Sequence, residues 1–96
     1  MTDDIHGKLR EELDIVDWRA LRSQLHRDSV ILVEPELDLV EVAWCVAKDR
    51  SAEVAGWVDA GQLRKPAAAE LIAWERDLDK SFRMLIVAPY LLVQAV

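Results

Sequence analysis

The chain has 96 residues, of which 52% are hydrophobic, and this length and composition predict one folded domain with a core of its own. Its 18 acidic and 12 basic side chains give a formal net charge of −6. Phosphate binding requires clustered lysine and arginine side chains, whereas the basic residues here are interleaved with acidic ones. We therefore expect no nucleic-acid partner.

A single cysteine, Cys45, excludes a disulfide within the chain and fits a reducing cytoplasm. The first four residues are acidic or polar, and no apolar signal region follows them. The longest uninterrupted apolar run, residues 42–47, is far shorter than a membrane span. These features predict a cytoplasmic protein that does not contact a membrane.

The N-terminal part of the chain predicts two helices and a strand. Residues 2–12 have apolar side chains at helical spacing, and Asp17 has the chemistry of an N-cap for a second helix over residues 18–27. Residues 30–33 are apolar on both faces, which is typical of a strand covered on both sides. Pro35 is expected to end this strand.

Three helices and two strands are predicted in the remainder. Asp38 is a good N-cap for a helix over residues 39–49, whose apolar side chains nearly encircle it. Such a helix packs on more than one side, or against another subunit. Four further elements follow: a helix over 52–60, a short edge strand over 62–65, a helix over 67–78 and a strand over 84–88. Ser51 is the expected cap of the first of these helices, and Gly61 its stop.

Two stretches of the chain, residues 31–42 and 85–96, align without gaps. Val33, Pro35, Leu37 and Val42 recur as Val87, Pro89, Leu91 and Val96. Each stretch reads as a strand halted by proline, so we predict that Val33 and Val87 lie on neighbouring parallel strands. The predicted fold is α/β: a small single-domain layered fold with a short, mostly parallel sheet and about five helices.

Four carboxylates, Glu34, Glu36, Asp38 and Glu41, lie between the first strand and the next helix. Ligand sites in open α/β sheets favour this end of a strand, and carboxylates there are able to hold a cation such as Mg²⁺. Asp38 is also a helix cap, and Glu41 lies in the first helical turn, where the helix dipole favours negative charge. The sequence favours this structural interpretation, so we predict no metal and no other cofactor.

No catalytic residue is predicted. Cys45 has no second cysteine beside it, and the two histidines, His6 and His26, lie far from it in the sequence, so neither a zinc site nor a Cys–His pair is expected. The serines and glycines form no nucleophile elbow or phosphate-binding loop. The four tryptophans stand at helical apolar spacing, which favours packing in the core or at an interface.

The C-terminal run after Pro89 has Gln94 as its only strongly polar side chain. Because proline ends a strand, we expect this run to leave the sheet and to be either tucked into the core or offered to a partner. The residues predicted at an interface are Tyr90, Leu91, Leu92 and Val93.

Three segments carry a recognisable order of motifs: ILVEPELDLVEVA, AGWVDAGQL and LIVAPYLLVQ. The last contains a closing Val-Ala-Pro-aromatic-x-Leu-Val-Gln motif, with Tyr90 as the aromatic residue. With these segments the chain resembles, over nearly its whole length, a family of small bacterial proteins known only as a domain of unknown function. The resemblance implies no activity, cofactor or catalytic residue.

Two functional hypotheses follow. The first is a non-enzymatic cytoplasmic protein that acts through protein–protein contact as a homodimer, because a small chain with such an apolar helix and C-terminal run has apolar surface to cover. The alternative is a metal-dependent or small-molecule-binding enzyme that uses the four carboxylates.

Overall fold

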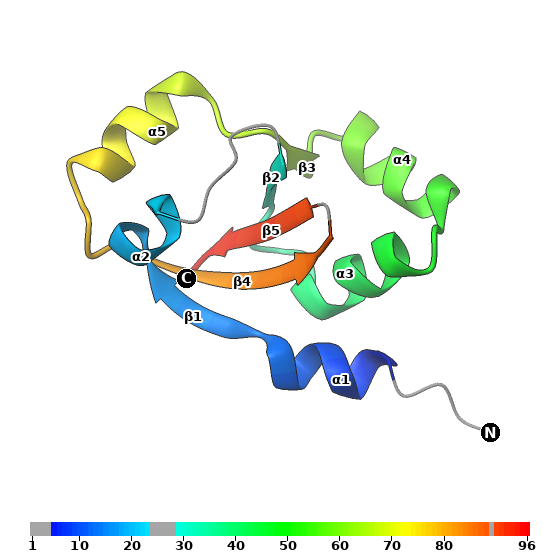
Figure 1. Cartoon of the computed structure of the whole chain (residues 1–96). Helices are drawn as coiled ribbons and strands as arrows, with labels where there is room; N and C mark the ends of the chain where they lie inside the picture. Colours follow the sequence, from blue (N-terminus) through cyan, green and yellow to red (C-terminus); the bar gives the residue numbers. More distant parts are fainter. Residues whose placement is uncertain (1–4, 24–28, 89) are drawn as a thin grey trace.

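The computed structural model describes residues 5–23, 29–88 and 90–96, and this part of the chain contains five helices and five strands (Figure 1). In chain order these are α1 (Ile5–Glu12), β1 (Asp14–Asp17), α2 (Trp18–Arg22), β2 (Val30–Val33), α3 (Leu39–Ala47), α4 (Ser51–Asp59), β3 (Leu63–Arg64), α5 (Ala68–Glu75), β4 (Ser81–Val87) and β5 (Tyr90–Ala95). The predicted α/β class and the number of helices are confirmed. The predicted parts of α1 and α2 at residues 2–4 and 24–27, and Pro89, lie outside the described residues.

Both predicted aspartate caps are confirmed. A carboxylate oxygen of Asp17 accepts a hydrogen bond of 2.9 Å from the backbone N–H of Ala20, and one of Asp38 accepts a bond of 3.0 Å from that of Val40. Each bond satisfies a backbone donor that has no partner within its helix.

The predicted cap of α4 is wrong. Ser51 is the first residue of this helix, and the N-cap is Arg50, which makes no capping hydrogen bond. The other end agrees with the prediction, because Gly61 follows the helix with a φ of 74°, a conformation that glycine adopts without strain.

The sheet has the strand order β1-β4-β5-β2-β3. Only β2 and β5 pair in parallel, while the other three pairs are antiparallel. The prediction of a mostly parallel sheet is therefore wrong, and the sheet is mixed. The reason is that β4 and β5 form a hairpin, which places two strands side by side without a helical crossover.

Val33 and Val87 do not lie on neighbouring parallel strands, so this prediction is also wrong. Val87 of β4 pairs with Tyr90 of β5, and β5 separates β4 from β2. The chain thus turns back immediately after β4. The parallel neighbour of β2 is β5, with Ile31 opposite Leu92.

The prediction that the C-terminal run leaves the sheet after Pro89 is wrong. It forms β5, the central strand of the sheet, and pairs on both sides. Three of the four predicted interface residues, Leu91, Leu92 and Val93, are buried within the chain, and only Tyr90 is exposed. A proline that precedes a strand removes no hydrogen bond from its ladder, which is why β5 is compatible with the sequence.

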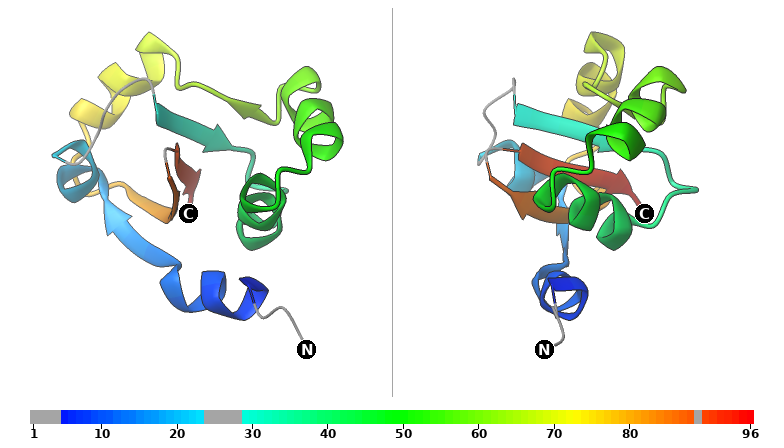
Figure 2. Two further views of the ribbon diagram at one scale, coloured as in Figure 1. Left: turned by 45° about the vertical axis from the view of Figure 1, so that its right-hand side comes forward. Right: turned by 90° about the vertical axis from the view of Figure 1, so that its right-hand side faces the viewer.

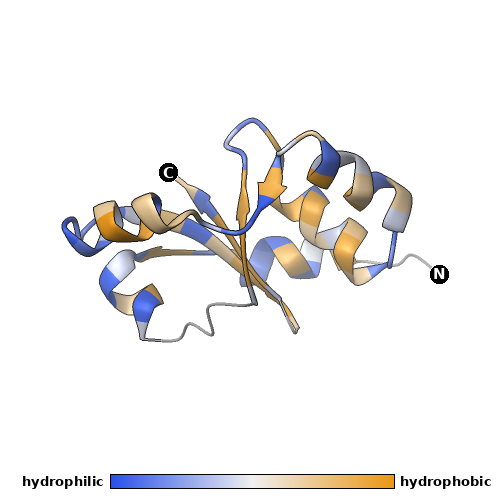
Figure 3. Ribbon diagram, turned by 90° about the horizontal axis from the view of Figure 1, so that it is seen from above, coloured by the Kyte–Doolittle hydropathy of each residue, from blue (hydrophilic) through white to orange (hydrophobic). Residues whose placement is uncertain are grey.

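Helices cover both faces of the sheet. Figure 3 shows the sheet edge-on, with α2 and α5 on one side and α3 and α4 on the other. On the first face Phe82 and Val93 pack with Trp18 and Trp74. The second face contributes Val33, Leu85 and Leu92, which pack with side chains of α3, among them Val42 and Ala43.

The all-round apolar character of α3 is explained within the chain. This helix contacts α1, α4, β4 and β5. In both views of Figure 2, α1 and α4 lie on opposite sides of α3. The prediction that this helix packs on more than one side is confirmed, and its neighbours belong to the same subunit.

Candidate functional site

The four carboxylates between β2 and α3 have separate surroundings. Asp38 caps α3, and a carboxylate oxygen of Glu41 lies 3.0 Å from Nε2 of His6 on α1. Glu36 is exposed in the turn, and Glu34 is half-buried. In residues 5–23, 29–88 and 90–96, no three acidic, histidine or cysteine side chains converge on a point where a metal ion would bind.

Cys45 is buried in α3. Burial raises the pKa of its thiol, the nearby carboxylates of Glu41 and Glu53 raise it further, and Arg50 opposes them. A nucleophilic cysteine needs the opposite, a lowered pKa. Of the two histidines, His6 interacts with Glu41, and His26 lies outside the described residues.

The tryptophans serve packing, as predicted. Trp18 and Trp74 are buried with ring centroids 5.1 Å apart, and both contact Phe82. Trp44 is half-buried at the surface of α3, where the His6 ring stacks on it at 4.8 Å and the guanidinium of Arg50 lies 4.8 Å from its ring centre. These contacts attach α1 and the start of α4 to α3.

An apolar hollow of about 580 Å³, here called the α4 groove, lies between α4, the end of α3 and the sheet. Its volume is in the range of binding sites for small molecules and short protein segments. The sheet contributes the starts of β2 and β5 and all of β3. Apolar side chains from all these elements line it: Ile31, Val46, Val54, Val58, Leu63 and Leu92.

Helix α4 forms one wall of this groove and is only partly covered. None of its nine residues is buried, although Val54 and Trp57 pack against the core beneath the helix. Val58, which lines the groove, is 53% exposed. On the opposite wall Tyr90 is 43% exposed. The groove therefore presents apolar side chains to the solvent from both walls.

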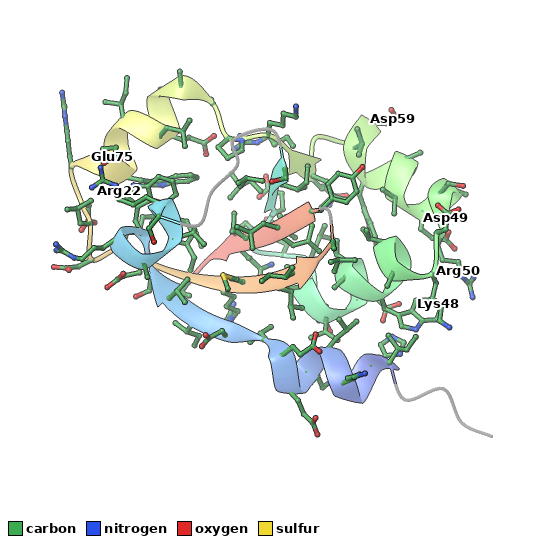
Figure 4. The ribbon with its side chains drawn as sticks, viewed as in Figure 1. Arg22, Lys48, Asp49, Arg50, Asp59 and Glu75 are labelled. Atoms are coloured by element: carbon green, nitrogen blue, oxygen red, sulfur yellow. The ribbon has the colours of Figure 1, made fainter. Side chains whose placement is uncertain are left out.

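Charged side chains of both signs border the groove. Asp49 and Arg50 lie at the corner between α3 and α4, and Asp59 lies at the other end of α4 (Figure 4). Arg64 and Lys65 follow on the side of β3. Arg64 is held by Glu70 of α5, with Nη2 2.9 Å from Oε2. Apart from Arg64, the border therefore contains two acidic residues, Asp49 and Asp59, and two basic residues, Arg50 and Lys65.

The sequence identified only part of this site. Two of the four predicted interface residues, Tyr90 and Leu92, line the α4 groove, but the four carboxylates do not. Val58 and Asp59 were predicted only as parts of the helix over residues 52–60. No signal in the sequence separates Val58 from Val54 and Trp57, because the spacing i, i+3, i+4 puts all three on one face of α4.

Comparisons with known proteins agree with the fold. The family model described as "Protein of unknown function (DUF2288)" matches residues 4–95. A solved structure, "NMR solution structure of PA1075 from Pseudomonas Aeruginosa", is similar with a TM-score of 0.76 and 31% sequence identity, and the match covers 99% of this chain and 87% of that chain. No curated protein matches the chain. In the described residues, no helix is both long and apolar enough to cross a membrane.

Proposed function

The chain belongs to the DUF2288 family of proteins of unknown function, and we propose that it acts without catalysis, through protein–protein contact, as a homodimer. We place the contact at the α4 groove and not at the C-terminal run. We keep the cytoplasm as the proposed location, since the thiol of Cys45 is unpaired.

The observation that carries this proposal is the apolar groove beside a helix that has no buried residue. A nine-residue helix is too short to be stable by itself in water, so packing must hold it in place. Exposed apolar side chains that gather around a hollow, with charged residues at its border, are the composition of a protein interface: an apolar centre and a polar rim.

The alternative, a metal-dependent or small-molecule-binding enzyme, uses carboxylates that have structural roles here. Asp38 is occupied by the backbone N–H groups at the start of α3, and Glu41 by His6. Thermal unfolding with and without millimolar Mg²⁺, Mn²⁺ or Ca²⁺ tests this alternative, because a ligand that binds only the folded state raises the midpoint. We expect no shift with any of the three cations.

Sedimentation equilibrium over a range of micromolar concentrations tests the homodimer. We expect a mass of about twice the 10.9 kDa of the chain. Val58→Glu places a charge in the groove and should convert the protein to a monomer. Ile72→Glu is the matched control, because Ile72 is also an exposed residue of a helix, at 56% against 53%, and does not line the groove.

Both variants change a side chain that is more than half exposed, so both should keep the circular dichroism spectrum of the native protein. A wild-type mass that stays at one chain throughout would remove the proposal. A dimer that survives Val58→Glu as well as Ile72→Glu would place the contact on another surface.

A further inference from the structure

We propose that two copies of this chain meet groove to groove about a two-fold axis, so that Asp59 of each copy faces Lys65 of the other. This inference rests on the proposed homodimer and adds to it the partner's orientation and the residues that determine it. The structure of one subunit supports it through the distribution of exposed apolar and charged side chains on the two walls of the α4 groove.

Each wall combines one exposed apolar side chain with one charge. On the wall formed by α4, Val58 is 53% exposed and Asp59 follows it directly. On the sheet wall, Tyr90 is 43% exposed at the start of β5, and Lys65 comes directly after β3. Strand β2 pairs with both of these strands, so Tyr90 and Lys65 lie at the same end of the sheet.

A two-fold axis that runs along the groove places the α4 wall of one copy against the sheet wall of the other, twice in each dimer. The apolar side chains Val58 and Tyr90 then meet, and the negative charge of Asp59 meets the positive charge of Lys65. Asp59 of each copy is thus matched by Lys65 of the other without any second surface being required. Away from the groove, two chains that each carry a net charge of −6 repel each other.

The other charged residues of the groove are less available for such a contact. Glu70 holds the guanidinium of Arg64, and that of Arg50 lies over the ring of Trp44. Asp49 precedes Arg50 in the chain, so the fields of these two neighbours partly cancel. Among the ion pairs in the described part of the chain, neither Asp59 nor Lys65 takes part in one.

The balance of charge also favours a second copy over other occupants. A strongly basic or strongly acidic partner would meet one wall of like charge in this groove, and like charges that face each other across an interface oppose binding. An uncharged apolar ligand would leave Asp59 and Lys65 unmatched at the border. A second copy offers a basic residue to Asp59 and an acidic residue to Lys65.

Charge reversal tests the pairing. Asp59→Lys alone sets lysine against Lys65 at both contacts of the dimer, and Lys65→Asp alone sets aspartate against Asp59. We expect each single variant to raise the dissociation constant of the dimer by at least about tenfold at low salt. Mixing the two variants in equal amounts should restore a dimer of one copy of each, because both of its contacts then join opposite charges. The measurement is sedimentation velocity of each variant and of the mixture.

The mixture separates a contact between copies from one within a copy. If Asp59 and Lys65 acted only within their own chain, the double variant Asp59→Lys/Lys65→Asp would recover but the mixture of single variants would not. Glu36→Lys and Lys8→Asp are the controls, since they make the same charge changes at exposed residues that do not line the groove. Both should keep the affinity of the wild type.

Each result has a defined meaning. Weakened single variants with a restored mixture support the inference. A wild-type dimer that neither single variant weakens, or that the mixture fails to restore, overturns the orientation and leaves the homodimer standing. A wild-type monomer overturns the homodimer itself; saturable binding of an apolar dye that Val58→Glu abolishes would then identify the groove as a small-molecule site.

Discussion

The side-chain amide nitrogen of Gln94 donates a hydrogen bond of 2.7 Å to the backbone carbonyl of Leu37. The same nitrogen donates a second bond, of 2.8 Å, to the carbonyl of Glu34. Gln94 is 2% exposed and belongs to β5, the central strand. The end of the sheet thus holds the turn that connects β2 to α3, which is also the turn that carries the acidic residues.

Gln94→Leu should destabilise the protein by about 3 kcal/mol, because leucine has a similar volume but leaves two partly buried carbonyl groups without a donor. Urea unfolding followed by tryptophan fluorescence measures the change. Gln62→Leu is the control: this side chain makes no hydrogen bond to a described residue, and we expect a change within about 0.5 kcal/mol. Equal stabilities of Gln94→Leu and the wild type would show that the amide does not hold the turn.

Removal of residues 90–96 should unfold the chain. These residues include the central strand, whose loss separates β4 from β2 and takes the buried side chains of Leu92 and Val93 out of both cores. Far-ultraviolet circular dichroism and amide proton dispersion should both report an unfolded protein. Deletion of Val96 alone, a residue that is 63% exposed, is the control and should be tolerated. A truncated chain that stays folded would contradict the central position of β5.

Features that depend on residues close together in the sequence could be predicted from it. Asp17 and Asp38 were identified as caps because a cap bonds to backbone groups two or three residues away, which the sequence displays directly. Residues 30–33 were identified as a strand because they are apolar on both faces, and the structure buries three of the four. The helix caps and this strand could therefore be predicted from neighbouring residues alone.

The pairing of the strands could not be predicted in the same way. The similarity of residues 31–42 and 85–96 is real, but it does not state that Val87 pairs with Tyr90, since pairing depends on the packing of the whole sheet. Strand β1 has only four residues, Asp14–Asp17, too few for an alternating pattern to stand out. The α4 groove was missed for a related reason: an open hollow arises from how α4 sits on β3 and α3.

Glu70 links α5 to β3, and its contribution should depend on pH. Hydrogen bonds from Arg64 are the main reason why the pKa of this carboxyl lies below its usual value of 4.5, and a bond from the backbone N–H of Ala67 lowers it further. A group with a lowered pKa in the folded state stabilises the protein above its unfolded-state pKa, and this stabilisation is lost as the pH falls through the folded-state pKa.

Glu70→Gln should therefore be less stable than the wild type by roughly 1 kcal/mol at neutral pH, since the ion pair is partly exposed and its capping bond is retained only in part. The difference should shrink at acid pH, below the lowered folded-state pKa of Glu70, because the wild-type carboxyl is protonated there. Urea unfolding at both pH values measures it, with Glu36→Gln, in the exposed turn, expected to match the wild type at neutral pH. A difference in the free energy of unfolding that has the same size at both pH values would contradict the role assigned to the hydrogen bonds from Arg64.

Asp14 is the first residue of β1, an edge strand of the sheet. The backbone N–H of Trp18 pairs with the carbonyl of Lys80 in the neighbouring chain segment, and because alternate residues of a strand point their N–H groups the same way, that of Ile15 points away from β4. The carboxylate of Asp14 accepts this N–H at 2.9 Å. The side chain of Ile15 is 59% exposed beside it, so an unprotected edge here would offer both a hydrogen-bond donor and an apolar contact to another strand.

Asp14→Ala should consequently promote association of edge strands into species larger than a dimer, and light scattering over a concentration series detects them. The experiment is best performed in a Val58→Glu background, where the contact at the α4 groove is removed and any growth in mass comes from another surface. Asp14→Asn is the control, because its amide oxygen still accepts the N–H of Ile15 while the charge is lost. If Asn and Ala associate to the same extent, the negative charge protects the edge; if only Ala associates, the hydrogen bond does. A mass that stays at one chain for both variants would show that β1 needs neither.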